Sequence, residues 1–267
     1  MARANRHYIP GCVWHITHRC HKKEFLLKFS RDRNRWVQWL YEARNRYGLV
    51  ILNYTVTSNH IHLLVVDTDR NAIPKSMQLI AGRTGQEYNQ RKNRKGAFWE
   101  DRYHATAVQT GSHLLSCMIY IDLNMVRAGV VKHPSEWKES GYNEIMNPPK
   151  RYLLIDQARL ENILGFSDRE ALRSTYTQLL DQTLQNNSLQ RQEAWTESIA
   201  VGSKEFISET KRTLASRAIG RDIHERNGVF ELREPSVSYS AHFDPKKYVL
   251  RPENTYFWNI NGDILTS

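Results

Sequence analysis

The sequence predicts an α+β fold in which helices cover one face of an antiparallel sheet. With 40% hydrophobic and 25% charged residues, the 267-residue chain has the composition of a globular protein. Short β-branched runs alternate with helical periodicity through the first 130 residues or so, and two of these runs are separated only by a turn. A hairpin inside the order β-α-β-β-α-β-α is typical of ferredoxin-like folds.

The first strand is expected at residues 12–20, where apolar and polar side chains alternate after a Pro-Gly turn. Residues 32–47 place their apolar side chains at helical spacing and stop before Gly48, a residue that favours a helix C-cap. The apolar runs 49–56 and 61–66 flank a short polar turn and predict two hairpin strands.

The second half of the sheet domain follows the same reasoning. Pro74 is expected to open a helix that ends in the basic loop 91–96, and residues 103–109 predict a further strand. Ser112 is the expected N-cap of an apolar helix that continues to residue 128 and is closed by Gly129.

Three regions follow from changes in composition along the chain. Residues 1–147 are expected to form the catalytic domain, and residues 148–233 a helical C-terminal region with helices near 169–185 and 203–218. Residues 234–267 contain prolines and scattered aromatic residues without a period, which predicts an extended tail.

The net charge of +10 lies entirely in the first part of the chain. Residues 1–150 hold 23 Lys and Arg against 12 Asp and Glu, whereas residues 151–267 hold 15 against 16. Such a positive field attracts polyanions, so nucleic acid is the leading partner and a solvated basic surface is the alternative. Three cysteines and the lack of an apolar span or leader predict a reduced, cytoplasmic protein.

Two histidines interrupt an apolar strand in the segment NHIHLLVV. Alternate residues of a strand face the same side, so His60 and His62 project together while Ile61 and Leu63 face the core. The pair can hold one metal ion, or each imidazole can be an ordinary hydrogen-bonded strand residue. The sequence pattern alone leaves both interpretations open.

A narrow polar stripe runs along the apolar helix that starts near residue 112. Its members lie three or four residues apart and are His113, Ser116, Tyr120, Asn124 and Arg127. In a functional interpretation the Tyr120 phenol ionises more readily near a metal and attacks phosphorus, Asn124 completes the metal shell and Arg127 holds a phosphate. The alternative is a buried tyrosine whose hydroxyl is satisfied by Asn124.

A second metal site was weighed around the first strand. Cys12, His15, His18, Cys20 and His21 have zinc-ligand chemistry. His15 and His18 face opposite sides of a strand, however, so this zinc site is disfavoured.

Three ordered motifs together resemble the REP-associated tyrosine transposases of the HUH nuclease superfamily. The motifs are HIH at residues 60–62, FWEDR at 98–102 and YIDLNMVRAG at 120–129, and the resemblance spans about residues 1–145. Two positions depart from the family pattern, which usually has proline in place of Met125 and Met-Pro in place of Thr57-Ser58.

The resemblance implies an HUH nuclease core that cuts single-stranded DNA near REP-type hairpins and rejoins strands. It implies a divalent metal, Mg²⁺ or Mn²⁺, with His60 and His62 as ligands, Asn124 as the third ligand and Tyr120 as the nucleophile that forms a 5′-phosphotyrosine. Basic and aromatic residues are expected to hold the DNA, and these are Arg3, Arg91, Lys92, Arg94, Lys95, Trp99, Arg102 and Arg127. A catalytically silent regulator that only binds hairpin DNA is the alternative, and a monomer is the working expectation.

Overall fold

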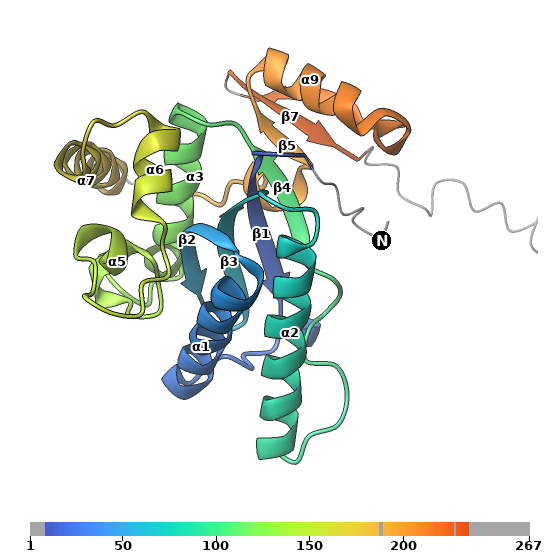
Figure 1. Cartoon of the computed structure of the whole chain (residues 1–267), viewed down its shortest axis with the longest axis vertical. Helices are drawn as coiled ribbons and strands as arrows, with labels where there is room; N and C mark the ends of the chain where they lie inside the picture. The colour runs from blue at the N-terminus through green and yellow to red at the C-terminus, as the bar shows by residue number, and fades with distance from the viewer. Residues whose placement is uncertain (1–8, 187–188, 227, 235–267) are drawn as a thin grey trace, which may run out of the picture. The chain divides into compact units, whose positions relative to one another are not determined.

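The computed structural model describes residues 9–186, 189–226 and 228–234 (Figure 1). The predicted α+β class is confirmed, with a seven-stranded, mostly antiparallel sheet and a largely helical C-terminal region. The expected tail at 234–267 lies outside the described residues apart from Glu234. The division at residue 147 stays a prediction.

The described part of the chain contains the following elements. The strands are β1 (Val13–Arg19), β2 (Val50–Val56), β3 (His60–Val66), β4 (His104–Val108), β5 (Ala200–Gly202), β6 (Asp222–Arg226) and β7 (Val229–Arg233). The α-helices are α1 (Ser30–Tyr47), α2 (Ala72–Arg91), α3 (Ser112–Asp122), α4 (Asn124–Arg127), α5 (Tyr142–Met146), α6 (Gln157–Leu164), α7 (Arg169–Gln185), α8 (Ala194–Glu197) and α9 (Lys204–Leu214). Short 3₁₀ turns occupy His21–Lys23, Pro134–Glu136 and Ala215–Ala218. None of the described helices has both the length and the apolar content needed to cross a bilayer.

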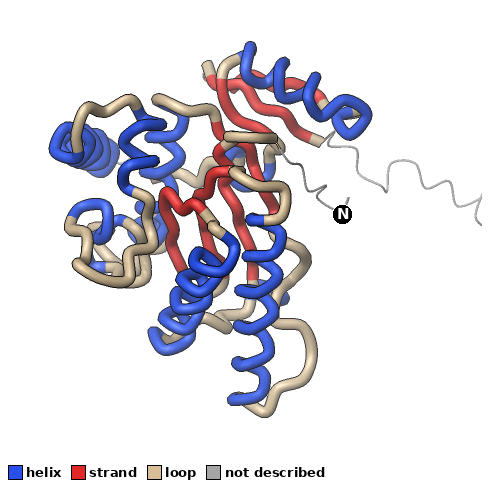
Figure 2. Tube along the Cα trace, viewed as in Figure 1, coloured by secondary structure: helices blue, strands red, loops and turns tan. Residues whose placement is uncertain are grey.

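The sheet has the order β2-β3-β1-β4-β5-β7-β6. Its first four strands are antiparallel and have the strand order of a ferredoxin-like fold, whereas β5 joins β4 in parallel. The strands β5, β6 and β7 come from the region that was expected to be helical, and they continue the same sheet beneath α9 (Figure 2). The C-terminal region therefore combines its helices with a sheet extension that periodicity did not predict.

Helices lie on both faces of the first four strands, which differs from the expected single helical layer. The pair α1 and α2 lies over one face (Figure 1). On the other face, Asp122 of α3 accepts a hydrogen bond from Asn53 of β2. The physical reason is the composition of α3, which is apolar around most of its circumference and must be buried on several sides.

Two helix ends test the sequence signals directly. Gly48 closes α1 in the left-handed conformation at φ 65°, as predicted. Ser112 is not an N-cap: it is the first residue of α3, and Gly111 occupies the cap position without a side-chain hydrogen bond. The expected single helix to residue 128 divides at Leu123, where ψ is 2°, although the Leu123 N–H still bonds the Ile119 carbonyl.

A buried carboxyl joins three elements behind the site. Asp122 of α3 accepts hydrogen bonds from the Tyr176 hydroxyl of α7 at 2.5 Å and from the Asn53 amide at 3.0 Å. Burial raises the pKa of Asp122 to about 7, and the two hydrogen bonds oppose that rise because they stabilise the carboxylate. The α3 helix is thus held between the sheet and the C-terminal helices.

Replacing Tyr176 by phenylalanine should destabilise the protein by about 1–3 kcal/mol, because the buried Asp122 carboxyl loses one of its two donors. The loss should be larger at pH 8 than at pH 5, since the pKa of the folded-state carboxyl rises further and only its ionised form needs the missing donor. Urea denaturation at both pH values measures this difference. Tyr152→Phe, at an exposed tyrosine, is the matched control. Equal costs at the two pH values would contradict the assigned role.

Candidate active site

The pairing of β1 with β3 places three histidines on one face of the sheet. His62 lies opposite Thr17 of β1, so it shares a face with His15, two residues earlier, and with His60. Ile61 and Leu63 are fully buried toward the other face, as expected. The ring centroids of His60 and His62 are 4.9 Å apart.

A series of hydrogen bonds determines which nitrogen of His62 carries its proton. The Trp195 carbonyl can only accept, so His15 Nδ1, 2.8 Å away, must donate to it. The Nε2 atom of neutral His15 then accepts from His62 Nδ1 at 2.9 Å. The lone pair of His62 is consequently left on Nε2, which lies 2.8 Å from the Asn124 amide.

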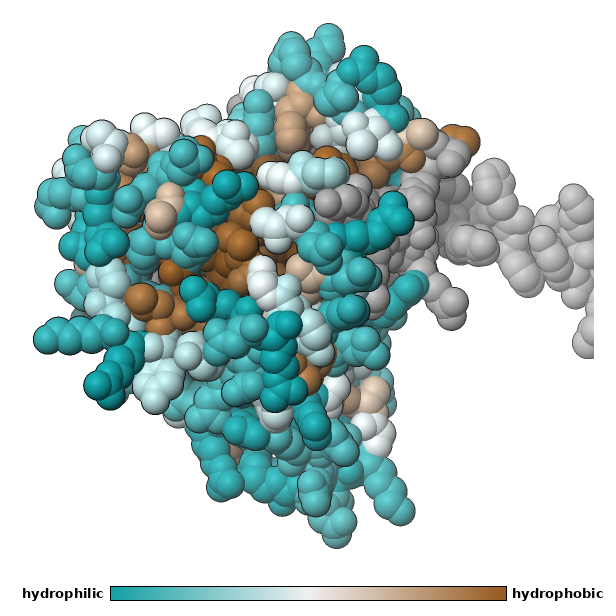
Figure 3. Space-filling model, in the orientation of Figure 1, coloured by the Kyte–Doolittle hydropathy of each residue, from teal (hydrophilic) through white to brown (hydrophobic). Residues whose placement is uncertain are grey.

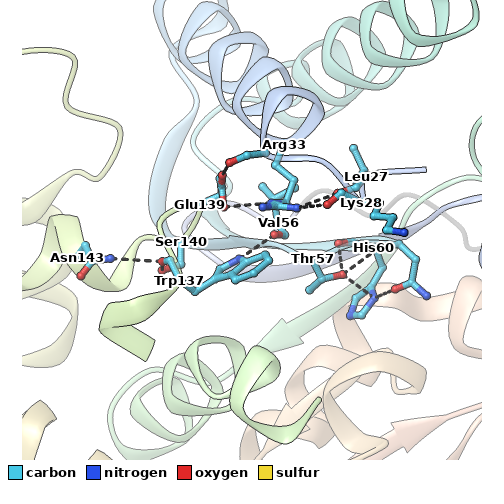
Figure 4. Close-up of polar contacts among 12 residues, drawn as sticks. Leu27, Lys28, Arg33, Val56, Thr57, His60, Trp137, Glu139, Ser140 and Asn143 are labelled. Carbon is cyan, nitrogen blue, oxygen red and sulfur yellow. Dashed lines mark hydrogen bonds and ion pairs between the residues drawn. The ribbon is translucent and has the colours of Figure 1, made fainter. Parts of the chain in front are cut away.

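The second histidine of the pair is oriented by its own hairpin turn (Figure 4). His60 Nδ1 lies 2.7 Å from Asn59 Oδ1 and 3.0 Å from Thr57 Oγ1. Because the Asn59 oxygen is an acceptor, His60 Nδ1 carries the proton and Nε2 keeps its lone pair. Thr57, one of the departures from the family pattern, therefore contributes a contact that orients His60.

Burial keeps these imidazoles uncharged at neutral pH. It lowers the pKa of His15 to about 3 and that of His60 to about 4. Burial lowers the pKa of His62 well below its usual value, and the neighbouring His60 and His15 add to the effect. Neutral imidazole is the form that binds metal, so no proton has to leave before a ligand site forms.

Tyr120 packs against the histidines from α3. Its ring centroid lies 5.9 Å from that of His62 and 6.3 Å from that of His15. The Arg127 guanidinium lies 4.1 Å from the ring centroid and donates to the Tyr120 carbonyl at 2.6 Å. Burial raises the Tyr120 pKa while Arg127 opposes the rise, so the expected easier ionisation is not a property of the protein groups alone.

The residues present fit a divalent metal. His60 and His62 each keep an Nε2 lone pair on the same face, and Asn124 lies beside them on α4. Rotation of the Asn124 amide exchanges its nitrogen and oxygen, so the same position can offer an oxygen ligand. The described residues contain no cluster of three His, Cys, Asp or Glu side chains suited to a metal, since the third donor here is an amide.

The residues expected to hold DNA have varied surroundings. Arg91 forms an ion pair with Asp32, and Arg94 bonds the Ala97 carbonyl at 2.9 Å and lies 3.6 Å from Glu24. Lys92, Lys95 and Arg102 are exposed. The two arginines therefore also stabilise their loop, whereas the other three cations extend into solvent.

Trp99 and Arg3 need separate mention. The Trp99 indole stacks on His18 with centroids 4.1 Å apart and donates to the Ala81 carbonyl at 3.0 Å, so it packs α2 onto the sheet. A role in base stacking stays a prediction. Arg3 lies outside the described residues.

The alternative zinc site near β1 is not formed. His15 belongs to the site face, while His18 on the opposite face bonds the Asp101 carbonyl at 2.8 Å. All three cysteines are free thiols, in agreement with the expected absence of a disulfide framework.

Two groups behind the metal pair were not predicted, the His15 imidazole and the Trp195 carbonyl. His15 drew attention only as a zinc ligand, although its period-two relation to Thr17 would have placed it on one face of its strand. Trp195 lies 180 residues further along the chain. Its carbonyl carries no signal in the sequence, because every residue has one.

Comparisons with known proteins agree on one family. Residues 8–124 match the model of the family described as "Transposase IS200 like". The chain is similar to a solved REP-associated tyrosine transposase bound to a REP hairpin, at 19% identity over 54% of this chain and 84% of that one, with a TM-score of 0.44. A putative transposase from Deinococcus radiodurans R1 is 17% identical over 43% and 90% of the two chains, with a TM-score of 0.32. No curated protein matches the chain significantly.

His15→Phe should weaken Mn²⁺ binding about 10- to 100-fold, because His62 loses the acceptor that keeps its proton on Nδ1. Isothermal titration calorimetry measures the affinity, and ¹⁵N chemical shifts of the His62 ring report the tautomer. His18→Phe is the matched control, since His18 is a similarly buried histidine of the same strand on the opposite face. An unchanged His62 tautomer in His15→Phe would exclude the proposed role of His15.

Proposed function

The chain belongs, through residues 8–124, to the IS200-like transposase family, and we propose that it is a metal-dependent endonuclease and strand transferase acting on single-stranded DNA. The observation that carries the proposal is the meeting of Tyr120 with two neutral histidines and an amide on one face of the sheet. A protein that only binds DNA has no need for this combination of groups.

His60, His62 and Asn124 would hold the metal. A divalent ion bound there would polarise the scissile phosphate and neutralise part of the charge that develops on its oxygens. The bond from Thr57 and Asn59 to His60, and the bond from His15 to His62, keep both imidazoles oriented with their Nε2 lone pairs free. Both histidines are therefore ready to bind before DNA arrives.

Tyr120 would be the nucleophile. Its hydroxyl oxygen forms a bond to phosphorus as the bond to the 3′ oxygen breaks, and that oxygen leaves as a 3′ hydroxyl after taking up a proton. The product is a 5′-phosphotyrosine, which preserves the phosphoester energy. Attack by a 3′ hydroxyl of the same or another strand then rejoins DNA and frees Tyr120.

DNA containing REP-type hairpins is the proposed substrate. The excess of positive charge in residues 1–150 supports a polyanionic partner. Exposed cations of the loop after α2, Lys92 and Lys95, and Arg102 beyond it are proposed to contact the backbone, with Arg3, Arg91, Arg94, Trp99 and Arg127 as further contacts. Arg127 would also orient Tyr120, whose carbonyl it binds.

Tyr120→Phe should abolish the covalent protein–DNA adduct while leaving hairpin binding within about twofold of wild type, because only one hydroxyl is removed. Denaturing gel electrophoresis after incubation of the full chain with a single-stranded hairpin library and Mg²⁺ or Mn²⁺ detects the adduct. Filter binding measures the affinity. An adduct that persists in Tyr120→Phe would move the nucleophile elsewhere. Wild type that binds hairpins but forms no adduct would favour the silent regulator.

His60→Ala and His62→Ala should each slow adduct formation by at least about 100-fold, because each change removes one metal ligand. High Mn²⁺ should partly restore either single variant but not the double, since Mn²⁺ accepts nitrogen ligands more readily than Mg²⁺. His104→Ala, on the same face but bonded to the Ser198 carbonyl, is the control. Rates are measured against metal concentration. Adduct formation by chelator-treated wild type would contradict the metal role.

A further inference from the structure

Two phenylalanines are exposed on the segment that links β1 to α1. Phe25 is 66% exposed and Phe29 57%, whereas Leu26 and Leu27 between them are buried. Exposed aromatic rings cost free energy in water unless they serve a contact. They are therefore candidates for a binding surface.

The backbone that carries these rings is held in place. Arg33 of α1 donates to the Leu27 carbonyl at 3.2 Å and to the Lys28 carbonyl at 2.6 Å, while Glu139 binds its other side at 3.0 Å (Figure 4). The Leu27 N–H also bonds the Ser58 carbonyl at 2.9 Å. The exposure of the two phenyl rings is thus imposed by an anchored loop.

Lysines surround the rings. Lys28 Nζ lies 5.9 Å and Lys92 Nζ 5.5 Å from the centroid of Phe29. Lys22, Lys23 and Lys95 are also exposed, and within the described parts of the chain none of these five lysines has an acidic ion-pair partner. Figure 3 shows a hydrophilic surface over the end of α2 that Lys92 follows. We call this set, Lys22, Lys23, Phe25, Lys28, Phe29, Lys92 and Lys95, the basic aromatic surface.

This surface continues into the active site. The Asn59 amide donates to the Lys23 carbonyl at 3.2 Å, and the Asn59 side-chain oxygen binds His60 Nδ1 at 2.7 Å. One asparagine therefore contacts both the lysine loop and a proposed metal ligand. A polymer bound at the metal pair would pass directly onto the basic aromatic surface.

We propose that the basic aromatic surface binds the single-stranded DNA that flanks the hairpin, an inference that rests on the proposed function. Bases of a single strand expose their faces and can stack on Phe25 and Phe29, whereas bases in a duplex are already stacked on one another. The lysines supply the charge that phosphates require. A second copy of the chain is a poorer partner, because it would bring the same positive charges together.

The test compares two labelled hairpins, one with single-stranded flanks and one blunt, in fluorescence anisotropy with the full chain. Phe25→Ala combined with Phe29→Ala should bind the flanked hairpin at least about 10-fold more weakly, as expected for lost base stacking, and should bind the blunt hairpin as wild type does. Replacing both phenylalanines by tryptophan should retain affinity for the flanked hairpin. Tyr152→Ala, at a 74% exposed aromatic residue, is the control.

Equal affinity of wild type and the double alanine variant for the flanked hairpin would overturn the inference. So would a wild-type dimer that the same variant dissociates in sedimentation, because the rings would then bind another copy. Adduct formation by wild type is scored separately. An adduct without loss of affinity in the variant refutes the surface alone, and loss of affinity without any wild-type adduct refutes the cleavage activity alone.

Discussion

The hydrogen-bond series from the Trp195 carbonyl through His15 to His62 is the interaction on which the site depends. A carbonyl cannot donate, so it sets the tautomer of His15, and His15 in turn sets that of His62. Both rings are buried, which keeps them neutral and makes the direction of each hydrogen bond unambiguous. The Nε2 lone pair facing Asn124 is the outcome of that arrangement.

The same series explains why the C-terminal region belongs to the chemistry. Thr106 and His104 of β4 bond the Ser198 carbonyl at 2.6 and 2.9 Å, and His15 bonds Trp195. Three side chains of the site face thereby hold one segment that lies after the family-matched residues 8–124. Buried carbonyls and buried polar side chains satisfy one another, which neither set can do alone.

Burial has opposite consequences for the two kinds of reactive group. It favours the neutral form of His60 and His62, which is the form that binds metal. It also favours the neutral form of Tyr120, which is the less nucleophilic form. Arg127, which lies against the phenol ring, offsets part of that second effect. The protein thus prepares the metal ligands fully and the nucleophile only in part.

Local periodicity in the sequence determined the α+β class, the shared face of His60 and His62, the alignment of Tyr120 with Asn124, and the end of α1 at Gly48. These features depend on backbone geometry within a few residues. Tertiary structure alone decided that Arg91 pairs with Asp32, that helices cover both faces, and that β5, β6 and β7 extend the sheet. It also decided that His15 lies behind His62, because that contact depends on the register between strands far apart in the chain, which no local pattern encodes.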